Sequence, residues 1–273
     1  MPIAFTENEF LKHVDEVNKI NYVYGNEVLY KSFNFSIMPH PSDTTYNVGK
    51  LSSAIWIIGK AYSADPTRSA TSLVKSEGLG LSFDKIANSI VNHPDYKKLY
   101  DKLDNLNSKT YSFTFGHDIS ILNDCVYCVN LLNNMIKDSM GDGSENVVSF
   151  CSKFLHFMCP NVFFIIDSLS LAGGIGLYSG RVNRIFQVET VSSSDWLEIT
   201  DSERNFLKSK LSIQNANASY DEPIKTYYNH CVRCYSLATY LNSAKKKCEP
   251  QIIGVGASTY MPRLVDSILI RIK

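Results

Sequence analysis

Apolar residues that recur with helical spacing constrain the fold of this chain more than any other feature of its sequence. The clearest example comprises Ile121, Leu122, Cys125, Cys128, Val129, Leu132, Met135 and Ile136. This spacing places them on one face of an α-helix, whereas a strand would alternate with every second residue. A helix with such a face buries it against other elements. We therefore predict a mainly α-helical protein.

The same periodicity predicts most of the other elements. We expect helices over residues 47–61, 82–91, 94–106, 147–158, 222–241 and about 262–272, and a capping box at Thr6-x-x-Glu9 predicts one near the N-terminus. Residues 22–42 are expected to be irregular or short β. Residues 172–180 hold four glycines and are expected to form a loop or a helix end. Strand signals are scarce, so we expect few or no strands.

Composition limits the domain organisation and the partners. The 273 residues include 44% hydrophobic side chains, enough for one core, and 27 basic residues balance 27 acidic ones. We predict one helical domain over residues 1–273, or two lobes at about 1–118 and 119–273 with a cleft between them. Zero net charge argues against general binding to polyanions, so a nucleic-acid site must be a local patch.

Hydropathy and the N-terminal sequence predict the cellular location of the protein. The longest apolar runs, residues 54–58 and 162–166, are far shorter than the ~20 residues of a membrane span. The first residues lack the basic and apolar regions of a secretory signal. We therefore expect a cytoplasmic protein with no membrane partner.

Two C-x-x-C pairs raise the alternative of a zinc site. They are Cys125 with Cys128, and Cys231 with Cys234. Four thiolates would suit structural zinc. Both pairs, however, lie within helix-periodic segments that lack the turn residues of a zinc knuckle. We favour packing of small buried side chains and expect no metal and no cofactor.

The segment from Ser152 to Ser168 is the strongest candidate for chemistry. Lys153 is expected on the polar flank of an otherwise buried helix, and Asp167 follows a short apolar run at the start of the next helix. Taken singly, Asp167 is best interpreted as a helix cap and Lys153 as a solvated charge. Taken as a pair, they offer an amine and a carboxylate for catalysis. His156, one turn after Lys153, either tunes the lysine or is a hydrogen-bonded packing histidine, which we favour.

The pattern S-K-F-L-H-F-x-x-P-x-x-F-x-I-x-D-S over residues 152–168 resembles a motif of bacterial oxoguanine-DNA-glycosylase-like proteins. This family is a divergent branch of the helix-hairpin-helix DNA glycosylases. Residues 56–68 and 262–266 resemble two further blocks of the same family. The resemblance implies a helical two-lobe fold in which a lysine and an aspartate face each other across a base pocket.

The function implied by the resemblance is cleavage of the N-glycosidic bond of a modified purine-like base in DNA. Lys153 would be the nucleophile, forming a Schiff base that permits strand scission, and Asp167 would stabilise charge on the sugar. Substrate-binding residues implied by the matching blocks are Lys60, Tyr62, Arg68, His156 and Arg263. Relatives of this type are associated with antiphage defence. The partner that the resemblance implies is nucleic acid, with DNA favoured, or a modified purine base.

Two other hypotheses of function stay open. In the first, the glycosylase-like scaffold is a catalytically inactive binding or adaptor module. In the second, the chain is a helical DNA-binding regulator. Glycines offer two weaker anion sites: Gly254-x-Gly256 before the last helix, and Gly173-Gly174-x-Gly176, which lacks the G-K-S/T ending of a P-loop. For both we favour ordinary structural roles.

Overall fold

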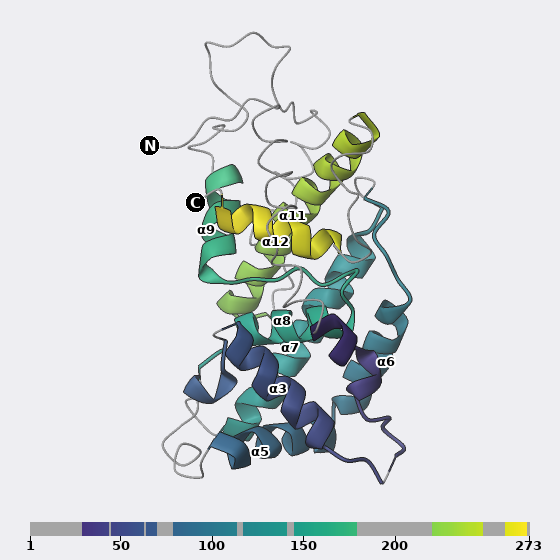
Figure 1. Cartoon of the computed structure of the whole chain (residues 1–273), viewed down its shortest axis with the longest axis vertical. Coiled ribbons are helices and arrows are strands. Elements are labelled where there is room, and N and C mark those ends of the chain that lie inside the picture. The colour runs from purple at the N-terminus through teal and green to yellow at the C-terminus, as the bar shows by residue number, and fades with distance from the viewer. Residues whose placement is uncertain are drawn as a thin grey trace.

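The fold is mainly α-helical in the computed structural model, as the periodicity predicts (Figure 1). The structure describes residues 29–43, 45–62, 64–69, 79–113, 117–140, 145–178, 220–247 and 260–271. No strand occurs within these ranges. The expected capping box at Thr6 and the Gly254-x-Gly256 string lie outside them.

The helices stack along the long axis of the molecule (Figure 1). At one end lie α3 (Gly49–Ala61) and α5 (Leu79–Asn92), with α6 (Tyr96–Asn107) at the side; α7 (Ile119–Met140) and α8 (Val148–Met158) fill the middle. At the other end lie α9 (Ser168–Tyr178), α11 (Glu222–Lys247) and α12 (Met261–Arg271). Short 3-10 turns occur at Phe35–Ile37 and Pro66–Ser69.

One hydrophobic core runs through both ends of this stack. Its members include Ile55 of α3, Leu132 of α7, Phe154 of α8 and Ile268 of α12. Helix α7 packs against α5 and α6 as well as against α11. Contacts therefore cross the boundary expected near residue 118, and a division into two lobes with a cleft remains a prediction.

Helix α9 decides between the two alternatives expected for residues 172–180, a loop or a helix end: the described part, residues 172–178, is the later part of a helix. Residues 168–178 are helical although they contain Gly173, Gly174 and Gly176. A Cβ atom at Gly173 would lie 2.0 Å from the carbonyl oxygen of Leu269 in α12. The glycine is thus used for close helix–helix contact, a role that sequence cannot distinguish from a turn. The helical conformation also argues against a phosphate-binding loop here.

The four cysteines of the C-x-x-C pairs are free and buried within α7 and α11, which confirms the core-packing interpretation. Burial raises the pKa of the Cys231 thiol to about 12. Among the described residues, no group of three or more His, Cys, Asp or Glu side chains is placed to hold a metal ion. None of the described helices combines the length and apolar character needed to cross a bilayer.

Candidate functional site

A buried connector between α8 and α9 positions the candidate site. Residues 162–166 are buried but belong to no strand. Side chains satisfy their carbonyl oxygens in turn: Tyr111 donates to Val162, His156 to Phe163, Tyr227 to Phe164, His230 to Ile165 and Ser149 to Ile166. Because a buried carbonyl needs a partner, these five bonds fix the path of the connector and the position of Asp167 at its end.

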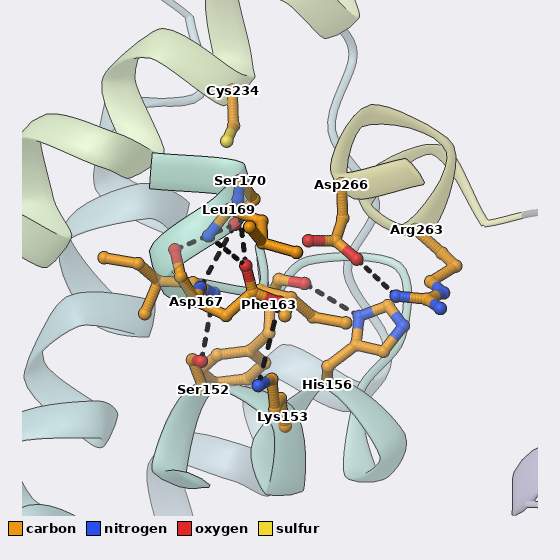
Figure 2. A network of polar contacts seen from close by, with 12 residues as sticks. Ser152, Lys153, His156, Phe163, Asp167, Leu169, Ser170, Cys234, Arg263 and Asp266 are labelled. Carbon is orange, nitrogen blue, oxygen red and sulfur yellow. Dashed lines mark hydrogen bonds and ion pairs between the residues drawn. The ribbon is translucent and has the colours of Figure 1, made fainter. Parts of the chain in front are cut away.

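Asp167 uses its two carboxylate oxygens differently (Figure 2). Oδ1 accepts hydrogen bonds from the backbone N–H groups of Leu169 at 2.9 Å and Ser170 at 2.8 Å. This is the helix cap that the sequence predicts. Oδ2 lies 3.8 Å from the Nζ atom of Lys153. The cap therefore leaves one oxygen of a fixed carboxylate turned towards the lysine.

Lys153 is buried, which corrects the prediction of a solvated charge on a polar flank. Its side chain is 4% exposed, while that of Asp167 is 24% exposed. The reason is that α8 packs against α3, α7 and α11, so every residue of the helix except Ser149 is buried. The lysine Nζ also donates to the Ser149 hydroxyl, one turn earlier, at 3.2 Å.

A second ion pair, Arg263 with Asp266, lies beside the first. Both residues belong to α12 and both are buried, and an Nη1 atom of Arg263 donates to Oδ2 of Asp266. Figure 2 shows this pair next to the segment that holds Asp167 and Ser170. Packing of α12 on α9 brings it there. Helix α12 thus supplies two charged side chains to a site whose other ion pair, Lys153 with Asp167, comes from much earlier in the chain.

Tyr62, the C-cap residue of α3, contacts the cations of both pairs. The Lys153 Nζ atom lies 5.8 Å from the centre of its ring, and the Arg263 guanidinium carbon lies 5.4 Å from it. Such cation–π contacts are stronger when the cation is desolvated. We call Lys153, Asp167, Arg263, Asp266 and Tyr62 the charge cluster.

Burial shifts the ionisation of the charge cluster in defined directions. Burial lowers the pKa of Lys153, while the nearby carboxylates of Asp167 and Asp266 act against that shift. Burial raises the pKa of Asp266 to about 6, with Arg263 acting against the shift and Asp167 adding to it. In both cases the charged form is disfavoured by loss of water.

His156 matches the packing histidine favoured from sequence. Its Nδ1 atom lies 2.8 Å from the Phe163 carbonyl oxygen, which can only accept, so Nδ1 carries the proton. The Nε2 atom lies 2.5 Å from the Tyr30 hydroxyl and accepts from it. Burial lowers the pKa of His156 to about 3, so the ring is neutral at neutral pH. With both nitrogens bonded inside the core, His156 has a structural role.

Two other expected substrate-binding residues, Lys60 and Arg68, are not placed in the charge cluster by the described contacts. Lys60 is half-exposed and pairs with Asp65 at 2.6 Å, across the end of α3. Arg68 lies in the 3-10 turn Pro66–Ser69, and its side chain lies outside the described part. Of the seven expected site residues, Lys153, Asp167, Tyr62 and Arg263 come together.

Sequence reasoning did not select Asp266, Ser149 or Tyr30. The sequence could have indicated Asp266, because this residue lies one turn after Arg263 in the last predicted helix. The neighbouring residues in that helix are apolar and buried: Leu264, Val265 and Ile268. A charged pair on such a face must be buried together. Ser149 had a similar signal, four residues before Lys153 on the same helix face. Nothing in the sequence linked Tyr30 to His156.

No protein-family model, no curated protein and no solved structure matches the chain.

Proposed function

We propose that this protein cleaves the N-glycosidic bond of a modified purine-like base in DNA, with Lys153 as nucleophile and Asp167 as its carboxylate partner. The observation that carries the proposal is a buried lysine amine 3.8 Å from a carboxylate whose other oxygen is fixed by two backbone amides. The family resemblance supplies the reaction class.

A lysine nucleophile must lose its proton before it can attack. Removal from water favours the neutral amine, which is the direction of the Lys153 pKa shift. The nearest described carboxylate oxygen able to receive the proton is Oδ2 of Asp167. The pair thus provides both the amine and a local acceptor for its proton.

The proposed reaction conserves atoms and charge. The neutral amine of Lys153 forms a bond to the anomeric carbon of the sugar, and the bond from that carbon to the base breaks. The bonding electron pair leaves with the base, which takes up a proton equivalent to the one that the lysine loses. Opening of the sugar ring then gives the Schiff base. The Asp167 carboxylate would stabilise positive charge that develops on the sugar.

The exposure of Asp167 and its neighbour indicates the side from which a nucleotide would approach Lys153. Asp167 is the partly exposed member of the pair, and the neighbouring Leu169 is one of the exposed large apolar side chains. A flipped nucleotide would therefore arrive past Asp167 and meet Lys153 beneath it. Because the whole chain is neutral, binding would depend on local contacts. A cytoplasmic role in DNA repair or antiphage defence belongs to the same proposal and comes from the resemblance.

Borohydride trapping tests the proposal. The purified protein would be incubated with borohydride and single- or double-stranded oligonucleotides that carry oxidised guanine or an abasic site. We expect a covalent adduct and base release with the wild type and neither with Lys153→Met. Lys97→Met, which changes an exposed lysine of α6, is the matched control and should behave as wild type. Trapping that persists in Lys153→Met would contradict the proposal.

A binding or adaptor module without catalysis is the alternative function. It is favoured by the engagement of Lys153 with Ser149 and by the capping role of Asp167, which together are sufficient for a structural account. This alternative predicts nucleic-acid binding by gel shift that is equal in wild type and Lys153→Met, with no base release by either protein.

A further inference from the structure

The cations of the two ion pairs in the charge cluster, Lys153–Asp167 and Arg263–Asp266, lie against one aromatic ring. Lys153 comes from α8, Asp167 from the start of α9, and both Arg263 and Asp266 from α12. The cations of the two pairs each lie within 6 Å of the Tyr62 ring centre, at 5.8 and 5.4 Å. Opposite charges at such short range and away from water interact more strongly than surface pairs do.

Asp266 is the fully buried carboxylate of this arrangement. Its side chain is 1% exposed, and its Oδ1 atom accepts no hydrogen bond within the part of the chain that the structure describes. The groups that act on the ionisation of Asp266 come from α12, α8 and the start of α9. They are Arg263 on its own helix, Lys153 from α8, and Asp167 and Ser170 at the start of α9. The charge of Asp266 in turn helps to raise the pKa values of Cys234 in α11 and of Tyr30.

We propose that Asp266 is a positioning residue that sets how much of Lys153 is free amine. The inference rests on the proposed function in giving Lys153 a catalytic task. Arg263 holds the Asp266 carboxylate within the charge cluster, where its negative charge favours the ammonium form of Lys153. Loss of that charge, by protonation or substitution, releases the amine.

The sign of the effect follows from electrostatics. A carboxylate near a lysine stabilises the ammonium form, and Asp266 acts in this direction on Lys153. Asp266→Asn keeps the shape of the side chain and removes the charge. The titration of Lys153 should then move to lower pH. A move of about one unit would raise the free-amine fraction at neutral pH about tenfold while the ammonium form predominates.

NMR on protein with isotope-labelled lysine measures this titration directly. The Lys153 ε-carbon resonance is assigned by its loss in Lys153→Arg and followed from acid to alkaline pH. We expect the midpoint to fall by about one pH unit in Asp266→Asn and to return towards wild type in Asp266→Glu. Asp124→Asn, which breaks the partly buried Lys102–Asp124 pair outside the cluster, should leave the midpoint unchanged.

A second readout needs no substitution at Asp266. Burial raises the pKa of Asp266 to about 6, so the wild-type Lys153 resonance should show a separate inflection near that pH. An unchanged midpoint in folded Asp266→Asn, or a wild-type curve with no inflection in that region, would overturn the proposal. Neither measurement uses a substrate, so failure of borohydride trapping and failure of this inference are distinguishable.

Discussion

At the scale of single residues, the protein assigns two tasks to Asp167. One oxygen caps α9 through the N–H groups of Leu169 and Ser170, and the other faces Lys153. Sequence predicted each task separately, since an aspartate before a helix is a typical cap. It could not predict that both are performed at once, because that depends on where α8 places the lysine.

Substitutions at Asp167 separate the two tasks. Asp167→Asn and Asp167→Ala both remove the charge next to Lys153, but only asparagine retains an oxygen that can cap α9. We expect Asp167→Ala to lower the free energy of unfolding by about 1 kcal/mol more than Asp167→Asn does. Urea denaturation measures the difference. Equal stabilities of the two variants would show that the cap contributes nothing.

Asp266 should leave a signature in the pH dependence of stability. Its pKa rises from 3.8 to about 6 on folding, so the native state binds more protons between these values. The stability it contributes is complete below pH 3.8 and is lost as the pH rises through about 6. Relative to Asp266→Asn, the free energy of unfolding of the wild type should fall by at most about 1.4 kcal/mol for each unit of pH increase in this window. Parallel stability curves for the two proteins would contradict this assignment.

At the scale of elements, periodicity predicted helices well and glycine content predicted them poorly. Helices α3, α7 and α8 bury most of the apolar residues whose spacing predicted them. The expected cap at Asp167 predicted where α9 begins, but its glycines left a loop or a helix end open over residues 172–180, whereas here Gly173 permits close approach to α12. The local sequence pattern shows which residues are apolar, but it does not show which helix will pack against a glycine.

Adjacent glycines of α9 provide a matched test of that packing. Gly173→Ala places a Cβ atom 2.0 Å from the Leu269 carbonyl oxygen, so α9 and α12 must separate. We expect this variant to lose about 1–3 kcal/mol of stability through overpacking. At Gly174 the nearest atoms lie 3.6 Å or more from a new Cβ, so Gly174→Ala should be neutral or stabilising through its helix propensity. Similar urea midpoints for the two variants would argue against the α9–α12 contact.

At the scale of the whole molecule, the site depends on helices that are distant in sequence. Lys153, Arg263 and Tyr62 meet because α8 lies in the middle of the stack, α12 packs on α9, and the end of α3 reaches both cations (Figure 1). Sequence predicted the lysine–aspartate pair from a short motif. It placed Lys153 in solvent because burial on all sides of α8 comes from tertiary packing alone.

The central claim is that the buried amine of Lys153 reacts with a sugar, and peptide mapping after borohydride reduction tests it most directly. The reduced adduct with an abasic-site oligonucleotide would be digested with nuclease and protease and analysed by mass spectrometry. The account predicts a deoxyribose-derived mass increment on Lys153 and none on exposed lysines such as Lys97. An increment on another lysine, with Lys153 unmodified, would contradict it.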